Sequence, residues 1–370
     1  MKIAFDARCL LGKRTGVGRY LLNLIKRMSS LRGEIEFNLF VDESIKKVHF
    51  GDKNNISIKK INAPNLLWKN IRLPFALMSD KAHLVHLPSY TIPFWAPCPT
   101  IVTIHDVIFA FHPEWCSKKQ HIRFKHLVRL SAKKANAIIV VSNSTKKELL
   151  DLTKISEDKI YLTYLAADEI FKPNKDPLVL ENLRQKYNFK EDYILHVGSL
   201  HPRRNIERII NAFSHLKKEI DKKIIFILVG QWFDKKNKLN DMAKKLNIIN
   251  YIKHIDYVPD DDLVKLYNFA DLFIYPSLYE GFGLPVLEAM ACGTPVITSN
   301  ISSLPEITGD AAFLVDPYNV YEMKEAMKSI LLEKELHSRL IEKGFKKIKN
   351  YTWNKAAEKT LEIYKNVIKL

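Results

Sequence analysis

Short apolar runs alternate with amphipathic stretches along most of the chain, and this alternation constrains the fold more than any other feature. Such runs are typical of parallel strands that are buried on both faces of a sheet. In the first half of the chain they lie at residues 2–5, 37–41, 84–87, 100–104 and 137–141. In the second half they lie at residues 193–197, 224–229, 272–275 and 295–298.

Helical patterns separate several of these runs. Residues 18–28, 206–216 and 285–291 repeat apolar side chains at helical spacing. Strands that alternate with helices predict a doubly wound α/β sheet. Because 370 residues exceed what one hydrophobic core usually organises, we expect this scheme twice, in two Rossmann-like domains.

A polar segment that contains two prolines marks the expected junction between the domains. The sequence Lys172-Pro-Asn-Lys-Asp-Pro177 would interrupt regular structure shortly before the strand expected at residue 193. We therefore assign residues 1–170 to an N-terminal domain, residues 171–190 to a linker and residues 191–351 to a C-terminal domain.

The sequence disfavours several classes of protein. The N-terminus lacks the apolar stretch of a secretory signal, and the uncharged stretch between Lys81 and Asp106 contains four prolines that would break a membrane-spanning helix. The four cysteines lie far apart without a Cys-x-x-Cys pair, which is typical of reduced thiols rather than of a disulfide framework or a zinc site. We expect a cytoplasmic protein.

The net charge of +17 indicates an anionic partner or an anionic substrate, and most of the excess lies before residue 170. Between Lys118 and Lys134, seven Lys and Arg residues are interspersed with apolar side chains such as Ile122 and Val128. This pattern fits peripheral contact with the anionic inner face of the cell membrane, and it equally fits an ordinary solvated helix. Charge alone leaves nucleic acid, membrane and substrate open.

The most specific motif lies between Tyr275 and Gly293. A strand ends, a glycine-rich loop follows, and Pro285 begins a helix that Gly293 ends. The loop glycines let a ligand approach the backbone closely, and the start of a helix favours an anion such as a diphosphate. The expected diphosphate cradle consists of Gly281, Phe282, Gly283 and Leu284.

Glu280 and Glu288 flank this cradle. Carboxylates do not contact phosphate favourably, so we expect them to accept hydrogen bonds from hydroxyls, such as those of a sugar on one side and a ribose on the other. Either glutamate alone could instead complement the helix dipole or cap a turn. Their combination with the loop glycines and the helix-starting proline favours ligand binding.

Two arginines follow the strand expected at residues 193–197. Arg203 and Arg204 precede a helix, and from this position two guanidinium groups could clamp a diphosphate bidentately. Each arginine taken alone is more often a solvated surface residue. The pair is therefore a candidate site that needs further support.

Three more candidates follow strands of the first half. His105 comes directly after the strand at residues 100–104, at the carboxyl end where open α/β sheets place their ligands. A lone histidine there is structural about as often as functional. Gly16 and Gly18 follow the first strand but form only Gly-x-Gly, which an ordinary turn explains equally well.

Glu280 and Glu288, with seven residues between them and Ala-Met-Ala-Cys-Gly-Thr-Pro-Val after them, resemble the E-x7-E signature of the family 4 retaining glycosyltransferases. Further similar segments are Thr15-Gly-Val-Gly-Arg-Tyr20, Thr103-Ile-His-Asp106, Val140-Val-Ser-Asn-Ser144, Val258-Pro-Asp260 and Leu304-Pro-Glu306. The resemblance covers essentially the whole chain. It implies the GT-B fold, in which two Rossmann-like domains face a deep interdomain cleft, with residues 352–370 completing the N-terminal, acceptor-binding domain.

The resemblance also implies roles for individual residues. Arg203 and Arg204 would bind the donor diphosphate, although relatives more often carry Lys at the second position. The other implied contacts are His105 with the donor sugar, Asp106 with the acceptor, Gly16 and Gly18 with the phosphates, and Val258 with the nucleobase.

Asp260-Asp-Asp262 could be mistaken for the metal-binding Asp-x-Asp of the other main glycosyltransferase fold. These residues stand at an expected helix start, where Asp is favoured, so we interpret them as helix capping. We expect neither a metal nor another cofactor. The sequence contains no nucleophile elbow, which disfavours a hydrolase.

We therefore expect a metal-independent, retaining hexosyltransferase that uses a nucleoside-diphosphate sugar. The segment Gly198–Asn205 looks most like that of polysaccharide mannosyltransferases, so GDP-mannose is the first choice of donor, with a saccharide or lipid-linked saccharide as acceptor. Two alternatives stay open. One is a sugar-nucleotide 2-epimerase, and the other is a non-catalytic nucleic-acid-binding protein, to which the charge points without a recognisable binding motif.

Overall fold

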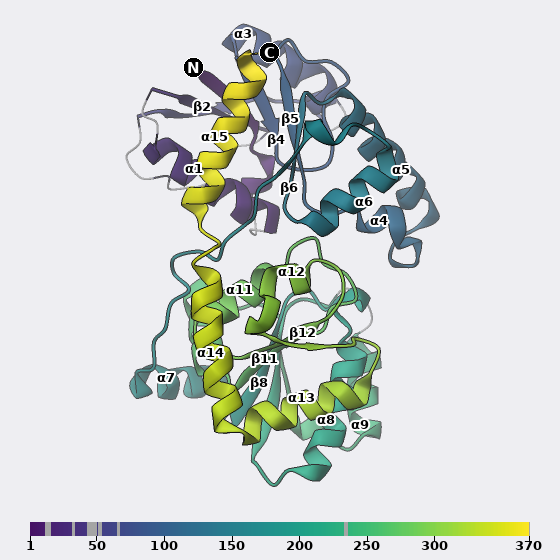
Figure 1. The fold of residues 1–370 in the computed structure, drawn as a ribbon, viewed down its shortest axis with the longest axis vertical. Helices are drawn as coiled ribbons and strands as arrows, with labels where there is room; N and C mark the ends of the chain where they lie inside the picture. Colours follow the sequence, from purple (N-terminus) through teal and green to yellow (C-terminus); the bar gives the residue numbers. More distant parts are fainter. Residues whose placement is uncertain are drawn as a thin grey trace. The chain divides into compact units, whose positions relative to one another are not determined.

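The computed structural model describes residues 1–11, 16–31, 34–42, 50, 54–64, 67–232 and 236–369. They form two compact units (Figure 1). The first unit comprises Met1–Leu165 together with Thr352–Leu370, and the second comprises Ala166–Tyr351. Thr15, part of one segment compared above, lies outside the described residues. Of the helices in the described ranges, none is long and apolar enough to cross a lipid bilayer.

The described part of the first unit contains a parallel sheet with the strand order β3-β2-β1-β4-β5-β6-β7. Its strands are β1 (Lys2–Asp6), β2 (Glu36–Val41), β3 (Ile56–Lys60), β4 (Leu84–Leu87), β5 (Thr100–Ile104), β6 (Ala137–Val140) and β7 (Ile160–Leu162). Its helices and helical turns are η1 (Arg8–Leu10), α1 (Gly16–Leu31), η2 (Trp68–Arg72), α3 (Leu73–Asp80), α4 (Ile108–Phe111), η3 (Pro113–Trp115), α5 (Lys118–Lys134), α6 (Asn143–Thr153), η4 (Glu157–Lys159) and α15 (Trp353–Lys369).

The second unit contains a parallel sheet with the order β10-β9-β8-β11-β12-β13. Its strands are β8 (Asp192–Val197), β9 (Ile224–Val229), β10 (Ile252–Ile255), β11 (Leu272–Tyr275), β12 (Val296–Ser299) and β13 (Phe313–Val315). Its helices and helical turns are α7 (Pro177–Tyr187), η5 (Pro202–Arg204), α8 (Ile206–Glu219), α9 (Lys236–Lys245), η6 (Ile249–Tyr251), α10 (Asp260–Phe269), α11 (Leu284–Ala291), α12 (Leu304–Thr308), η7 (Gly309–Ala311), α13 (Val320–Leu332) and α14 (Lys334–Ile348).

Both sheets have the doubly wound order, in which the chain adds strands first on one side of its first strand and then on the other. The reversal falls between β1 and β4 in the first unit and between β8 and β11 in the second. Open α/β sheets bind ligands at this switch point, outside the carboxyl ends of the strands. The sequence-based prediction of two doubly wound sheets is therefore confirmed.

All nine strands predicted from apolar runs are present, and the four that the prediction missed, β3, β7, β10 and β13, are the edge strands of the two sheets. Interior strands such as β4 and β5 are buried along their whole length. The edge strands are partly exposed, and β3 and β10 contain polar residues that interrupt the apolar pattern. The other two, β7 and β13, are apolar but have only three residues each, which is too short for the runs on which the prediction depended.

The segment assigned to a linker, residues 171–190, lies within the second unit and contains α7. Asp176 caps this helix by accepting a hydrogen bond from the backbone N–H of Leu178 (2.9 Å), and Pro177 is its first residue. Asp at the N-cap and Pro at the first helical position begin a helix rather than break one. The linker assignment was wrong because it treated Pro177 only as a breaker.

A histidine is buried in the core of each unit. Burial, together with the charge of His105, lowers the pKa of His86 to about 3, and burial likewise lowers the pKa of His196 to about 3. In the unfolded chain a histidine takes up a proton below about pH 6.5. Stability is therefore complete above that pH, and it falls as the pH decreases from 6.5 towards 3.

We predict that lowering the pH from 7.5 to 5 costs about 2 kcal/mol of unfolding free energy for each of these two histidines, because each excludes a proton that the unfolded chain binds. Urea unfolding followed at both pH values measures this loss. Replacing His196 with Gln should reduce the pH dependence of the second unit only. Unfolding curves that coincide at the two pH values would contradict the prediction.

Candidate functional site

The switch point of the second sheet brings two segments together that are distant in sequence. Arg203 and Arg204 lie in η5, which follows β8, and Glu280 lies in the loop that follows β11. The backbone N–H of Leu278 donates to the carbonyl of Arg203 (2.8 Å) and joins the two segments. Chain topology therefore places both arginines beside Glu280.

Glu280 forms ion pairs with both arginines. Its Oε2 lies 3.2 Å from Nη1 of Arg203, and its Oε1 is paired with Nη1 of Arg204. Arg203 also donates to the carbonyl of Tyr279 (3.1 Å), and Arg204 donates to Oγ of Ser277 (3.3 Å). Two guanidiniums and one carboxylate leave this cluster with one net positive charge, which favours an anionic ligand.

Two members of the cluster are almost wholly removed from water, since Glu280 is 6 % exposed and Arg204 is 8 % exposed, whereas Arg203 is only partly buried. The guanidinium of Arg204 stacks on the ring of Tyr275, 4.7 Å from its centroid. Gly198 has a φ of 144°, and a Cβ there would stand 3.5 Å from Nε of Arg204. Packing from several sides therefore fixes the Arg204 side chain before any ligand arrives.

His201 supports η5, the helical turn that contains Arg203 and Arg204. Burial, followed by the charges of Arg203 and Arg204, lowers the pKa of His201 to about 4. The ring is thus neutral near pH 7, and its Nδ1 accepts a hydrogen bond from the backbone N–H of Arg203 (3.2 Å). The sequence did not single out this histidine, because a neutral capping side chain has no motif of its own.

Two serines brace the glycine-rich loop. Oγ of Ser302 accepts from the backbone N–H of Glu280 (3.1 Å) and lies 2.7 Å from the Glu280 carbonyl, and Oγ of Ser303 lies 2.9 Å from the carbonyls of Glu280 and Phe282. Both serines follow β12 and were missed from the sequence. Small hydroxyl residues directly after a neighbouring strand were the available signal.

The loop ends at Gly283, which has a φ of 110°. This positive φ favours glycine, and a Cβ at this position would stand 2.7 Å from Cδ2 of Leu304, so the Leu304 side chain would have to move. Leu284 then begins α11. The segment from Gly281 to Leu284 therefore leads directly into the positive end of a helix, and its role as a diphosphate cradle stays a prediction.

Glu288 lies one turn into α11 and is 7 % exposed. Its Oε2 accepts a hydrogen bond from the hydroxyl of Tyr267 (3.1 Å), which belongs to α10. The Tyr267 ring packs against Phe273 of β11, with centroids 5.3 Å apart. Tyr267, another residue that the sequence did not single out, orients the Glu288 carboxylate.

Val258 follows the edge strand β10 and is 6 % exposed. The three aspartates after it occupy the first turn of α10, at the predicted helix start, but the N-cap is Pro259 and no side-chain hydrogen bond caps this helix, so the capping interpretation was wrong. Although burial raises it, hydrogen bonds from Lys186, Lys265 and Tyr187 lower the pKa of Asp262 to about 2. In the described parts of the chain, no three His, Cys, Asp or Glu side chains gather as metal ligands would.

His105 follows β5 at the carboxyl edge of the first sheet. Its Nε2 lies 2.9 Å from the carbonyl of Pro88, which can only accept, so Nε2 carries the proton. Burial lowers the pKa of His105, although the Pro88 carbonyl and Asp106 oppose this. The neutral ring therefore presents Nδ1 as a hydrogen-bond acceptor.

Asp106 is oriented by two donors. The hydroxyl of Tyr90 donates to its Oδ2 (3.0 Å), and the backbone N–H of Ile108 donates to its Oδ1 (3.2 Å). Gly16 and Gly18 lie in the first turn of α1, and a Cβ added to Gly16 would meet no atom within 4 Å. Gly16 is therefore not required by packing in the described structure.

A chain of buried polar groups lies behind His105. The hydroxyl of Tyr364 in α15 is 2.6 Å from Nδ1 of His86, whose Nε2 is 2.7 Å from Oγ1 of Thr103. Oγ1 of Thr103 is in turn 2.9 Å from the Tyr20 hydroxyl. The Tyr20 ring packs edge-on against the His105 ring, with centroids 4.9 Å apart. The last helix of the chain thus contributes to the position of His105.

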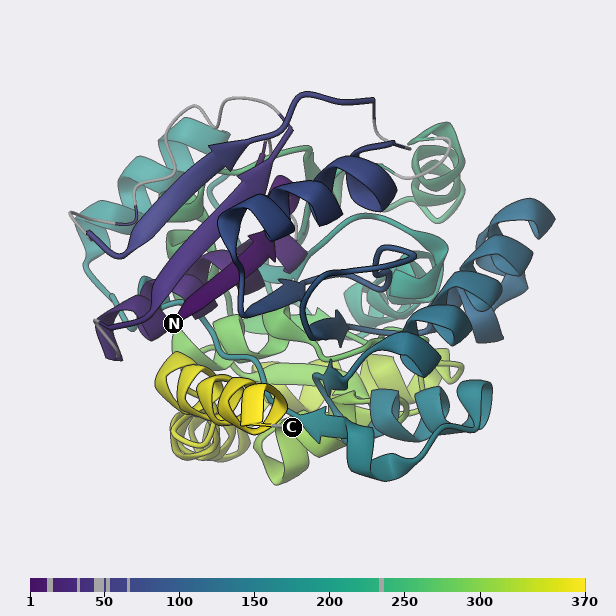
Figure 2. The ribbon, with the colours of Figure 1, turned by 90° about the horizontal axis from the view of Figure 1, so that it is seen from above.

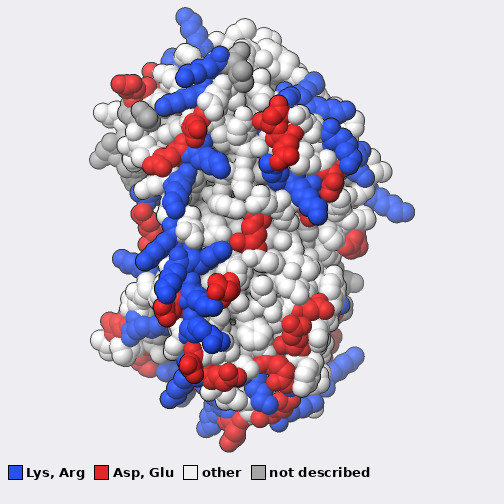
Figure 3. All heavy atoms as spheres, viewed as in Figure 1, with Lys and Arg blue, Asp and Glu red and all other residues white. Residues whose placement is uncertain are grey.

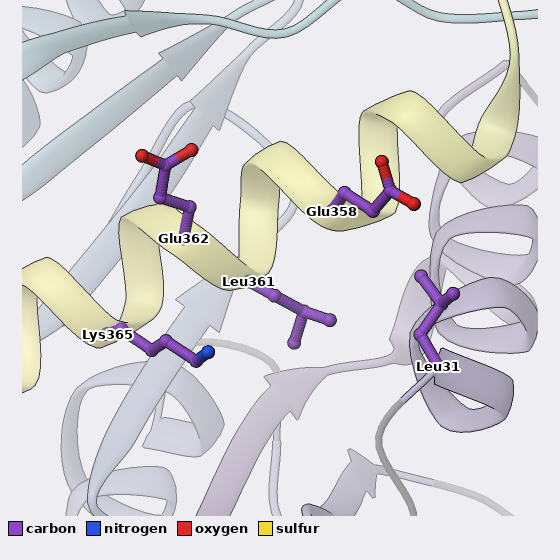
Figure 4. Close-up of a pocket in the computed structure, with 5 residues that line it drawn as sticks. All are labelled: Leu31, Glu358, Leu361, Glu362 and Lys365. Carbon is purple, nitrogen blue, oxygen red and sulfur yellow. The ribbon is translucent and has the colours of Figure 1, made fainter.

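A cavity of about 400 Å³ lies elsewhere in the first unit, beside α15 and the end of α1 (Figure 4). Its lining residues are Leu31, Glu358, Leu361, Glu362 and Lys365. None of them was predicted as a site residue. The candidate residues instead form two groups, one at the carboxyl edge of each sheet.

Two doubly wound parallel sheets with polar groups at their switch points define the GT-B class. Residues 180–347 match the model of the glycosyl transferases group 1, and residues 14–169 match that of glycosyltransferase family 4. The chain belongs to this family of glycosyltransferases and is a transferase, so the predicted family is confirmed. The epimerase alternative is not supported, and the non-catalytic alternative was wrong.

Individual relatives agree with this assignment. O-antigen chain mannosyltransferase B of Escherichia coli is 31 % identical over 99 % of this chain and all of its own length. The serotype-specific mannosyltransferase WbdA of the same species is 29 % identical over 75 % of this chain and 35 % of its own length. Among solved structures, Anabaena HepE in complex with UDP and glucose superposes with a TM-score of 0.79 at 18 % identity, over 99 % of this chain and 100 % of HepE.

We predict that Tyr364→Phe destabilises the first unit by about 1–3 kcal/mol, because it leaves a ring nitrogen of the buried His86 without this partner. Urea unfolding of the full chain measures the loss. Tyr318→Phe, at a tyrosine that is 59 % exposed, is the matched control and should change stability by less than about 0.5 kcal/mol. Equal stability of the Tyr364 variant and the parent would contradict the buried polar chain.

Proposed function

We propose that this glycosyltransferase moves mannose from GDP-mannose to a hydroxyl of a saccharide or lipid-linked saccharide, with retention of anomeric configuration. The names of two relatives support mannose as the sugar, since both are mannosyltransferases and one is similar over nearly the whole chain. The name O-antigen chain mannosyltransferase supports a growing glycan as acceptor.

The observation that carries the proposal is the buried cluster of Arg203, Arg204 and Glu280 at the switch point of the second sheet. In our proposal the diphosphate of the donor binds the guanidiniums of Arg203 and Arg204 and the backbone from Gly281 to Leu284. Because a guanidinium carries five N–H donors in a rigid fork, each arginine can hold Glu280 and a phosphate oxygen together.

Three further contacts complete the proposed donor site. Glu288, oriented by Tyr267, accepts hydrogen bonds from the ribose hydroxyls. Val258 packs against the base. Glu280, through the oxygens that the arginines hold in place, accepts a hydrogen bond from a hydroxyl of the sugar.

The ion pairs of Glu280 favour one mechanism of retention. Retaining glycosidases use a carboxylate as a nucleophile, but a carboxylate whose two oxygens are both paired with guanidiniums is a weak one. We therefore propose front-face substitution. The bond from the anomeric carbon to the phosphate oxygen breaks, the acceptor oxygen forms its bond on the same face, and the acceptor proton passes to the departing phosphate.

The positive charge of Arg203 and Arg204 stabilises the negative charge that develops on the departing diphosphate. We propose on this ground that the reaction needs no metal ion and no other cofactor. The charge-stabilising role usually given to a divalent cation falls to two preorganised side chains.

In the first unit, we propose that Nδ1 of His105 accepts a hydrogen bond from a donor-sugar hydroxyl, which its tautomer allows. Asp106, held by Tyr90 and by the Ile108 backbone, binds an acceptor hydroxyl. Gly16 and Gly18 allow the phosphates to approach the start of α1.

We further propose that α5 contacts an anionic membrane from the cytoplasmic side. Ser117 and Gln120 form a capping box at its start, and its sequence contains seven Lys and Arg residues and no acidic residue. Figure 3 shows Lys and Arg gathered on the surface over this helix. Cations gathered on one exposed helix without acidic neighbours on that helix are attracted to anionic lipid headgroups.

We predict that Glu280→Gln lowers kcat by about 10²–10³-fold while changing nucleotide affinity much less, because it removes a contact made to the reacting sugar. Arg203→Ala should weaken both turnover and GDP binding. Initial rates and calorimetric GDP titrations separate the two effects. Glu335→Gln, at an exposed glutamate in α14, is the matched control, and an unchanged kcat for the Glu280 variant would overturn its assignment.

We predict that GDP raises the thermal stability of the chain more than UDP or ADP does. Ligand at 100 times its Kd stabilises a folded protein by about 2.7 kcal/mol, so a thermal-shift series ranks the three nucleotides. With GDP-mannose and an oligomannoside acceptor, the products should be GDP and an α-mannoside. A larger shift with UDP would overturn the donor but leave the transferase assignment intact.

A further inference from the structure

Helix η2–α3, which runs from Trp68 to Asp80, is apolar on both of its sides. Its inner side buries Trp68, Leu73 and Leu77 in the core. Its outer side presents Leu67, Ile71, Phe75 and Met78, which follow one another at spacings of four, four and three residues along the same face. A surface helix normally carries polar residues on the face turned away from the core, so this outer face is unusual.

The loop before β5 extends this apolar face. Phe94 and Trp95 are both exposed, and the ring of Trp95 meets that of Phe75 edge-on with centroids 5.6 Å apart. The six side chains, which are between 43 % and 61 % exposed, form what we call the apolar stripe: Leu67, Ile71, Phe75, Met78, Phe94 and Trp95. Neighbouring exposed side chains of this size on a soluble protein mark an interaction surface.

The stripe and the basic helix α5 face the same way. Leu77 of α3 and Val128 and Ala132 of α5 belong to one core cluster, which packs on one face of the first sheet. Figure 2 shows α3 and α5 on one side of that sheet and α15 on the other. The outward sides of α3 and α5 therefore form one surface, and Lys134 of α5 donates to the Phe94 carbonyl (3.0 Å).

The charged residues around the apolar stripe indicate which kind of partner binds it. Arg72, Lys81, Lys133 and Lys134 are exposed beside it. The carboxylate of Asp80, the one acid of residues 67–81, is largely buried by its bonds to Lys59 and Asn38. Aromatic and aliphatic side chains next to Lys and Arg are typical of a surface that enters the boundary between lipid headgroups and acyl chains. A second copy of this chain, with its net charge of +17, would instead be repelled.

We propose that the apolar stripe inserts into the outer part of an anionic bilayer and that Phe75 and Trp95 are its deepest side chains. The proposal rests on the contact of α5 with anionic lipid proposed above. It adds burial of apolar side chains in the bilayer, which charge alone does not supply. Basic residues attract the chain to the surface and the stripe holds it there. Binding should therefore depend on both anionic lipid and the stripe.

The test compares the full-length chain with the double variant Phe75→Ser, Trp95→Ser in sedimentation with phosphatidylcholine vesicles that contain 0 or 30 % phosphatidylglycerol. The parent should bind only the anionic vesicles, and the double variant should bind them at least about tenfold more weakly. Leu178→Ser and Leu332→Ser, at exposed leucines of the second unit, are the matched controls and should bind like the parent. Thermal unfolding of each variant detects loss of folding.

Insertion has a second, direct readout. In a Trp115→Phe, Trp232→Phe background, Trp95 is the only exposed tryptophan among the described residues, since Trp68 and Trp353 are buried. Vesicles with brominated acyl chains should quench its fluorescence, and 0.5 M salt should weaken binding without abolishing the quenching of the bound fraction. Binding without quenching, or binding unchanged in the double variant, would overturn the proposal.

Sedimentation of the lipid-free chain tests whether a second copy of the chain, rather than a bilayer, binds the apolar stripe. Dimerisation that the double variant abolishes would assign the stripe to a second copy and would also overturn the proposal. Transfer to a water-soluble acceptor should be unchanged in the double variant. If the parent lacks transfer with every donor tested, the proposed function fails, while the vesicle results remain informative.

Discussion

A largely buried ionic cluster joins η5 to the glycine-rich loop and holds the candidate site of the second unit together. Taking two guanidiniums and a carboxylate out of water is costly unless each charge is paired and hydrogen-bonded. Arg203, Arg204 and Glu280 meet this condition only because β8 and β11 are neighbours, which brings η5 against the glycine-rich loop. The Tyr275 ring, on which Arg204 stacks, and the contact of Ser303 with the Glu280 carbonyl help to hold these charged groups in place.

The first unit has a corresponding polar network, which is uncharged. Burial keeps His86 neutral, and its two ring nitrogens are matched by hydroxyls from two different elements. A half-satisfied network would be worse than an apolar core, so Tyr364 and Thr103 must both be in place. Because Tyr364 is in α15, the last helix is part of the surroundings of His105 rather than a peripheral addition. Fixed polar groups at both sheet edges suit a reaction that depends on positioning and charge stabilisation.

Much of this could be predicted because it depends on local sequence. The interior strands have continuous apolar runs, and the segment from Glu280 to Glu288 carries its glycines, its proline and its carboxylates within a few residues. The edge strands could not be predicted in the same way, because partial exposure admits polar residues into β3 and β10, and because β7 and β13 have only three residues each. Pro177 was misjudged because a proline that breaks a strand and a proline that begins a helix look alike without knowledge of the capping Asp176.

The sequence by itself determined the doubly wound fold, the family and the identity of the charged candidates, since strand patterning and motif chemistry are properties of neighbouring residues. Only the tertiary structure decided how those candidates are paired. Glu280 proved to be held by both arginines, and it was Tyr267, Ser302 and Ser303 that proved to support the site. The reason is physical: long-range partners are chosen by strand order, and a side chain that only supports another carries no pattern of its own.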